Sequence, residues 1–278
     1  SATMCRPKPF QCLNMSTANA MMDIVIAELK KLKRYGILIA GFIVTILAGV
    51  YAFAPALAND GVKKTYSLVM NNTLESNCIY FFPAMIVLIG GLIARREYTD
   101  DTLKNILTVP VTRRQLLMGK IVVLFIMTVV FSVLSFLFGS ALCFVMGLPD
   151  ATLPIMAEWL ARIVAGNVLL FVAVLPFTIV AELFVDTVYA CTAVGFVYGF
   201  LASLESAMLN YYPTKAVLIL TDPQCGVGYD FVHYSKLSAS ITLVVVLLIS
   251  GILFALLKPT KALIKTKSPK KVARVKGW

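Results

Sequence analysis

Charged residues are scarce in this sequence: Asp, Glu, Lys and Arg make up 14% of its 278 residues, and apolar residues make up 59%. Soluble domains average about 25% charged residues, so this composition excludes a water-soluble globule. Stretches of about 17 to 26 almost uncharged residues recur along the chain, and each can cross a hydrocarbon core of ~30 Å as a helix. The sequence therefore predicts an all-α, polytopic membrane protein. A transmembrane barrel would instead alternate apolar and polar residues in segments of about ten.

Motifs for nucleotide or metal chemistry are also missing. The sequence has no GxxxxGK[ST] phosphate loop, no GxGxxG and no HExxH. The single histidine, His233, stands among aromatic residues, which favours an interfacial aromatic belt over a zinc site. No CxxC pair occurs among the six cysteines, and a disulfide between Cys78 and Cys225 stays open as an alternative to two free thiols. We expect no catalytic residue, no metal and no cofactor bound by this chain.

Six apolar segments are long enough to span a bilayer as transmembrane helices. Their ranges are 36–58, 78–94, 121–146, 163–181, 188–208 and 237–257. Only residues 182–187 separate the fourth segment from the fifth. We expect a helical hairpin there, with Glu182 and Asp186 at its tip, because carboxylates are costly at the centre of a bilayer.

Lysine and arginine are distributed unevenly between the two sides of this arrangement. Twenty of the 25 lysine and arginine residues lie before residue 36, in the segment 95–120 or after residue 257. Four lie in the other connections, and Arg162 lies at the boundary of a span. Basic residues gather on the cytoplasmic side of membrane proteins, so both termini are expected in the cytosol. The basic tail 258–278 then faces anionic lipid headgroups, which accounts for the net charge of +11 without a nucleic-acid partner.

Two segments precede the first span. Residues 1–19 have no apolar signal-peptide core and are expected to be an unstructured or cloning-derived tail. In the segment 20–35, apolar residues recur at spacings of three and four, with lysine and arginine around them, which predicts an amphipathic helix in the inner membrane interface. An extension of the first span into the cytosol is the alternative. The apolar positions are Met22, Val25, Ile26, Leu29 and Leu32.

The segment 95–120 contains more helix-start and helix-stop signals than a plain connection needs. Asp100 and Asp101 suit the first turn of a short helix, where the helix dipole favours acidic residues. Pro110 ends that helix, and Thr112 with Gln115 forms a T-x-x-Q capping box that starts the third span. We therefore expect a short amphipathic helix under the membrane. Its apolar side is formed by Leu103, Ile106 and Leu107.

At these residues the sequence resembles the permease subunits of type-2 ABC exporters, particularly the small six-span permeases for bacteriocins, bacitracin-like antibiotics and amphipathic toxin peptides. That family's pattern is a Glu, then Gly-Thr-Leu-Lys, a Pro-hydrophobic-Ser/Thr-Arg turn, and Gly-Lys. The pattern is matched here by Glu97, Thr102-Leu103-Lys104, Pro110-Val111-Thr112-Arg113 and Gly119-Lys120. Asp101 stands where glycine is usual, and the segment 27–34 also resembles the opening of that family.

The resemblance implies a type-2 ABC exporter fold in the bacterial plasma membrane, with two copies of a separate ATPase that bind ATP and Mg. The segment 95–120 would hold a cytosolic coupling helix seated in that ATPase, joined to the second span at Glu97. A solvated charged loop explains the basic residues but not the proline and the capping box. The residues implied in ATPase coupling are Glu97, Asp100, Asp101, Thr102, Leu103, Lys104, Ile106, Leu107, Pro110 and Arg113.

Small residues recur at every fourth position of the first and fifth spans, and such stripes let helices approach closely in lipid. In the resembling exporters these two spans meet across a permease dimer, which assigns the stripes to a dimer interface; packing within one subunit is the alternative. The assigned residues are Gly41, Thr45, Gly49, Gly195, Gly199 and Ser203. A substrate path between the subunits is expected to be lined by Phe81, Phe82, Met85, Phe196 and Tyr198.

Two further predictions concern the outer side. Arg162 starts the fourth span and Glu205 nears the end of the fifth, which predicts a structural ion pair, with a substrate or ion contact as the alternative. The outer segment 209–236 begins with Tyr-Tyr-Pro-Thr and continues with apolar residues. That pattern predicts a short re-entrant or interfacial helix capped near Thr214.

These observations favour a transport subunit without enzyme activity. It would pair with a second copy or a paralogue and move an amphipathic peptide, lipid or drug outward, and the peptide class rests on the resemblance alone. A self-powered secondary transporter or channel is the alternative; it predicts broken helices and buried ionisable residues near the midplane, of which the sequence has few. An intramembrane enzyme would need carboxylate, Ser/His or metal-ligand clusters within the spans, which the sequence lacks.

Overall fold

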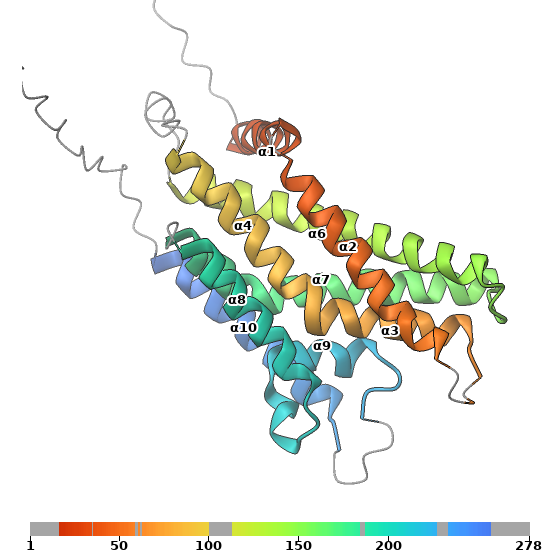
Figure 1. Ribbon diagram of the computed structural model, residues 1–278. Helices are drawn as coiled ribbons and strands as arrows, with labels where there is room; N and C mark the ends of the chain where they lie inside the picture. Colours follow the sequence, from red (N-terminus) through yellow and green to blue (C-terminus); the bar gives the residue numbers. More distant parts are fainter. Residues whose placement is uncertain are drawn as a thin grey trace, which may run out of the picture.

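The chain folds into a bundle of helices. The computed structural model describes residues 17–34, 36–58, 61, 63–99, 113–183, 187–226 and 233–256, and within them every regular element is a helix, as predicted. The elements are α1 (Thr17–Arg34), α2 (Ile37–Phe53), η1 (Ala54–Leu57), α3 (Tyr66–Ser76), η2 (Asn77–Phe81), α4 (Phe82–Thr99), α6 (Arg113–Val145), α7 (Leu153–Leu183), α8 (Val188–Phe200), η4 (Leu201–Ser203), η5 (Ala207–Tyr211), α9 (Pro213–Thr221) and α10 (Lys236–Leu256). The long helices run side by side, and α1 lies crosswise at one end (Figure 1). We call the two ends the α1 end and the α9 end.

Five helical stretches are long and apolar enough to cross a membrane. They are Leu38–Leu57, Tyr66–Arg95, Arg114–Val145, Leu153–Ala181 and Lys236–Leu256. A sixth apolar stretch, Val188–Ser203, is shorter. These stretches correspond to the six predicted segments, and the number that crosses the bilayer stays a prediction.

Three helices begin earlier than their hydropathy predicted, at Tyr66, Arg113 and Leu153 instead of residues 78, 121 and 163. The second span shows why, because its polar first half is hydrogen-bonded inside the bundle. Asn72 and Ser76 donate to the carbonyls of Ala52 and Ala48 on α2, each at 3.4 Å. The fifth span is instead shorter than predicted: its helical turns stop at Ser203, where the prediction extended to residue 208.

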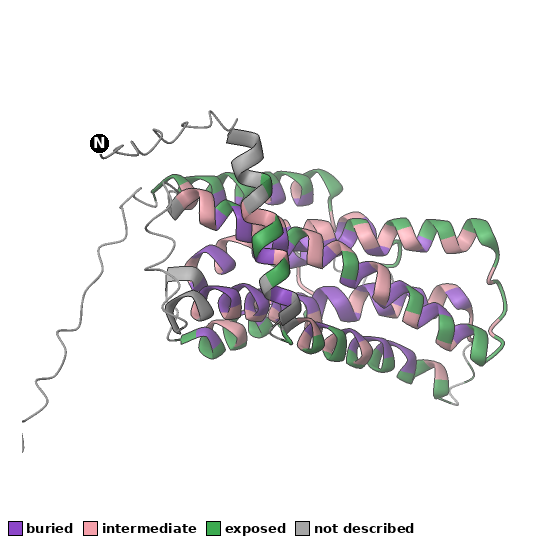
Figure 2. Ribbon diagram, turned by 90° about the horizontal axis from the view of Figure 1, so that it is seen from above, coloured by how far each residue is buried: buried purple, intermediate pink, exposed green. Residues whose placement is uncertain are grey.

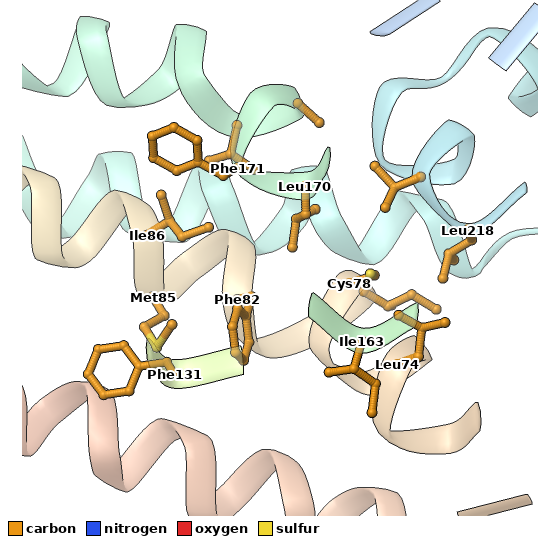
Figure 3. Close-up of a cluster of buried hydrophobic side chains, with 14 of the residues drawn as sticks. Leu74, Cys78, Phe82, Met85, Ile86, Phe131, Ile163, Leu170, Phe171 and Leu218 are labelled. Carbon is orange, nitrogen blue, oxygen red and sulfur yellow. The ribbon is translucent and has the colours of Figure 1, made fainter. Parts of the chain in front are cut away.

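The central rod of the bundle is formed by α3, η2 and α4. In its most apolar stretch 72% of the residues are buried, against 22% in α10 at the periphery. The rod contains one π-helical segment, η2, and there Asn77 donates to Ser135 Oγ of α6 at 3.0 Å. Figure 3 shows the apolar core beside this segment, where Phe82 and Met85 lie near Phe131 of α6. Helix α4 packs against both α7 and α8, so the rod connects most of the bundle.

Local residues account for the turns between the helices. Gly36 adopts a left-handed φ of 65°, which glycine tolerates and which separates α1 from α2. Thr65 caps α3 by accepting the N–H of Leu68, and Pro213 occupies the first turn of α9, where its missing N–H costs nothing.

Large apolar side chains cover the outside of the bundle. Figure 2 shows exposed residues along the outward faces of the long helices. Phe42 of α2, Leu137 of α6 and Leu248 of α10 are 49%, 54% and 62% exposed. So much exposed apolar surface suits a protein that is surrounded by lipid.

Candidate functional site

Of the predicted ATPase-coupling residues, the structure places two, Glu97 and Arg113, and both lie at the α1 end of the bundle. There α4 ends at Thr99 and α6 begins at Arg113, so Glu97, in the last turn of α4, and Arg113 come to the same end (Figure 1). The other predicted coupling residues lie outside the described residues, and the coupling helix stays a prediction. They are Asp100, Asp101, Thr102, Leu103, Lys104, Ile106, Leu107 and Pro110.

Helix α1 packs across the start of α6 at this end. Gly119 makes room for it, because a Cβ there would lie 2.5 Å from Cγ2 of Ile24. Leu32 is buried, whereas Met22 and Ile26 are 63% and 44% exposed. Helix α1 is a separate element from α2 in this structure, and its exposed apolar side chains suit a place in the membrane interface, which stays a prediction.

Two arginines hold the peripheral helices at the α1 end. Arg114 of α6 donates to the carbonyl of Ala255 at 2.5 Å, near the end of α10. The guanidinium of Arg95 on α4 lies 5.7 Å from the ring centroid of Tyr189 on α8. These two contacts link the ends of α6 and α4 to α10 and α8, respectively.

The small-residue stripes assigned to a dimer interface pack within the subunit in this structure. A Cβ at Gly41 or Gly49 would lie 2.3 Å from the ring of Phe131 or Phe138 on α6, and Thr45 between them is buried. These residues of the first span therefore pack within the subunit, as the alternative had it.

The stripe of the fifth span also packs within the subunit. A Cβ at Gly195 would lie 3.0 Å from Cγ2 of Val87 on α4. At Gly199 it would lie 2.4 Å from the carbonyl oxygen of Ile79. Ser203 donates to the carbonyl of Phe200 on its own helix.

The predicted substrate path divides into buried and surface residues. Phe82 and Met85 are 0% and 2% exposed in the apolar core (Figure 3), so placing them on a path is wrong for this conformation. Tyr198 is also turned inward, because its hydroxyl donates to the carbonyl of Ala173 on α7 at 3.1 Å. Phe196 is 44% exposed, and Phe81 is half-buried.

Phe81 and Phe196 belong to an aromatic cluster between α2, η2 and α8, which also contains Tyr51, Tyr80 and Phe200. The ring centroids of Tyr51 and Tyr80 are 5.1 Å apart, and those of Tyr80 and Phe200 are 6.1 Å apart. Tyr51 is 50% exposed and Phe200 44%. The π-helical turn at η2 shifts the register of the rod at this point, a feature often found at functional sites.

The predicted ion pair between Arg162 and Glu205 is wrong, because each residue has another partner. Arg162 pairs with Glu158, one turn earlier on α7, at 2.6 Å. Glu205 pairs with Lys215 of α9 at 2.5 Å and accepts the hydroxyl of Tyr234. The chain between α8 and α10 folds back on itself, and this brings residues 205, 215 and 234 together.

The outer segment contains the predicted short helix, which is α9 (Pro213–Thr221). Seven of its nine residues are buried, including Lys215 at 3% exposed, and the helix packs against α7 and α10. Cys78 and Cys225 are free thiols, so the disulfide alternative is not realised. Burial raises the pKa of the Cys225 thiol to about 12. Burial and the hydrogen bond to Glu205 also raise the pKa of Tyr234.

Sequence reasoning missed a second group of polar residues beside this ion pair. Glu75 of α3 and Asp222, directly after α9, lie in hydrogen-bonding contact, and Asn71 donates to Glu75 at 3.4 Å. The spacing of Asn71 and Glu75, four residues apart in a helix, was a usable signal, but the predicted span began after them. In the described part of the chain, no three or more His, Cys, Asp or Glu gather as a metal-binding group.

Comparison with known proteins shows which family and which relative the chain matches. Residues 24–202 match the model of the family described as ABC-2 family transporter protein. The chain is 32% identical over 155 residues to the bacitracin transport permease protein BCRB of Bacillus licheniformis, a match that covers 52% of this chain and 72% of that relative. No solved structure matches the chain. The family match runs from α1 to η4 and includes both helices that flank residues 100–112.

Proposed function

The chain belongs to the ABC-2 family of transporter proteins, and from this membership we propose that it is the transmembrane subunit of an exporter driven by a separate ATPase. The observation that carries the proposal is the family match over residues 24–202, which spans most of the helical bundle. The sequence has no phosphate-binding loop of its own, so the energy for transport comes from the partner.

The α1 end is the proposed docking side for the ATPase and faces the cytosol. Most of the lysine and arginine residues precede α2, follow α10 or stand between the second and third spans in the sequence, as expected for cytoplasmic segments. The central rod runs from Thr99 at this end to Tyr66 at the other, passing the aromatic cluster at η2. A movement of the coupling segment 100–112 therefore has a continuous helical route to that cluster.

The proposed substrate is an amphipathic peptide of the bacitracin class. The name of the Bacillus licheniformis relative supports this class, and so does the chemistry of the aromatic cluster, whose rings offer a half-exposed apolar surface. Because the small-residue stripes are used inside the subunit, a second copy would meet this one through the outer faces of α2 and α8. The aromatic cluster lies between those two faces, where a path between subunits would run.

The first test is purification of the protein from native membranes in mild detergent, with mass analysis of what accompanies it. An ATPase with a phosphate-binding loop in equal copy number supports the proposal. A chain that remains alone under several gentle conditions contradicts it and favours the self-powered transporter, for which proton- or sodium-driven flux would be measured.

Replacing Asn105 by proline is expected to abolish the stimulation of ATP hydrolysis by bacitracin in the reconstituted complex. Proline removes a backbone donor and clashes with the preceding turn, at a cost of about 3 kcal/mol in a helix interior. The matched control is Asn105→Ala, which keeps the helix and should retain stimulation. If Asn105→Pro and Glu97→Gln both retain wild-type stimulation while the ATPase stays bound, the coupling assignment is wrong.

Truncating the aromatic cluster is expected to weaken the response to peptide. We expect Phe200→Ala to raise the bacitracin concentration for half-maximal ATPase stimulation by about tenfold, since an aromatic pair contributes about 0.5–1.5 kcal/mol beyond its buried area. Phe144→Ala is the control, because Phe144 is 56% exposed on α6, away from the cluster. Equal responses of the two variants would show that the aromatic cluster does not line the substrate path.

A further inference from the structure

The polar cluster at the α9 end contains more carboxyl groups than cationic groups. Lys215 is the cation of the cluster, and its ammonium group pairs with Glu205 at 2.5 Å while lying 5.2 Å from the ring centroid of Tyr234. Tyr234 donates to the other oxygen of Glu205. Lys215 and Glu205 thus form a satisfied, neutral pair, and two more carboxyl groups remain beside it.

These two carboxyl groups belong to Glu75 and Asp222, and they touch each other. They lie in hydrogen-bonding contact, although an ionised carboxylate only accepts hydrogen bonds. Asp222 is 6% exposed, and its Oδ1 is held by the backbone N–H of Gln224 at 2.7 Å. Glu75 is half-buried, and two negative charges in contact in such a place repel each other strongly unless a positive charge lies between them.

Asn71 supplies an independent observation at the same place. It is 3% exposed, its Nδ2 donates to Glu75 Oε1 at 3.4 Å, and its Oδ1 is buried without a hydrogen-bond partner. Turning the amide over would place its oxygen against the carboxylate of Glu75, so the orientation is fixed. A buried acceptor without a donor therefore lies beside the carboxyl group of Glu75, whose contact with Asp222 also has no donor when both groups are ionised.

We propose that Glu75, Asp222 and Oδ1 of Asn71 form a binding site for one small cation. Three oxygens of this kind are ligands that hard metal ions such as Ca²⁺ prefer, with water completing the shell. A proton shared between the two carboxyl groups supplies the same positive charge, with a water bound to Asn71. Both sources satisfy the cluster by the same chemistry.

The site joins α3 to the residue that follows α9. Glu75 belongs to the central rod, and α9 packs against α7 and α10, so the cation fixes the outer helix on the rod. Loss of the cation leaves two carboxylates in contact and pushes α9 away from α3. The charged and titratable groups around the pair are Lys215, Glu205, Cys225, Tyr80 and Cys78, with Arg162 bound to the carbonyl of Thr221.

The test uses the full chain in nanodiscs with two readouts. Infrared spectroscopy measures a protonated carboxyl group, and thermal unfolding is followed in CaCl₂, NaCl or choline chloride with chelator at constant ionic strength. The variants are Glu75→Gln, Asp222→Asn and Asn71→Leu, and the control is Glu158→Gln, which removes only the exposed ion pair with Arg162.

Each source of the cation gives a distinct result. A metal ion raises the wild-type melting temperature by several degrees, an effect lost in Glu75→Gln, Asp222→Asn and Asn71→Leu but kept in Glu158→Gln. A shared proton gives a protonated-carboxyl band that is absent from Glu75→Gln and from Asp222→Asn, and a melting temperature that falls as pH rises in the wild type alone. A wild-type protein with neither the band nor a metal dependence, or variants that keep them, overturns the proposal.

Discussion

Replacing Lys215 with methionine is expected to destabilise the folded protein by about 3–5 kcal/mol, because removing one partner of a buried ion pair leaves the other charge unpaired. Lys215 is 3% exposed and Glu205 20%, and the pair holds α9 to the chain that leaves α8. Methionine keeps the length and the apolar contacts of the side chain, so the loss reports the charge. The measurement is thermal unfolding of the detergent-purified protein by fluorescence-detected size-exclusion chromatography.

The control for this prediction is the exposed pair on α7. Glu158→Gln is expected to change the free energy of unfolding by at most about 1 kcal/mol. The side chains of Glu158 and Arg162 are 57% and 33% exposed, so each charge is also stabilised by water when the pair is broken. The double variant Lys215→Met with Glu205→Gln should recover part of the loss, since no unpaired buried charge remains. Equal effects of Lys215→Met and Glu158→Gln would show that the pair is solvated and that α9 is not buried as described.

The elements with a local signal were predictable from the sequence. Apolar length predicted the membrane helices, spacing of three and four predicted α1, and the Tyr-Tyr-Pro-Thr sequence predicted α9. The start of α3 at Tyr66 was not predictable from hydropathy, because Asn72 and Ser76 are satisfied by carbonyls of α2 that are distant in sequence. A hydropathy window counts such polar residues as a boundary, whereas the folded bundle hydrogen-bonds them.

The partners of the site residues were the part that sequence could not supply. Glu205 was correctly expected in an ion pair, but the spacing of spans pointed to Arg162, and only the fold of residues 204–226 brings Lys215 to it. Glu75 and Asp222 meet for the same reason, across more than a hundred residues. A stripe of small residues likewise indicates that another helix comes close, without indicating which helix it is.

Adding a single methyl group at Gly199 is expected to separate α8 from the central rod. The new Cβ of Gly199→Ala would lie 2.4 Å from the carbonyl oxygen of Ile79 and 2.7 Å from Cγ of Pro83, and neither a backbone oxygen nor a proline ring can turn aside. We expect a loss of about 1–3 kcal/mol or more, the usual cost of overpacking.

Gly251→Ala on α10 is the matched control for Gly199→Ala, because nothing lies within 4 Å of its Cβ, and helix propensity alone should make it neutral or more stable by up to about 1 kcal/mol. Thermal unfolding of both variants, with their oligomeric state measured in the same chromatography, decides where the stripe packs. Contact within the subunit lowers the melting temperature of Gly199→Ala whatever its oligomeric state. The opposite outcome is a Gly199→Ala protein that melts at the wild-type temperature but elutes as a smaller assembly. That result would show that the stripe lies in an interface between subunits, because the lost contact would then have been made by the partner copy.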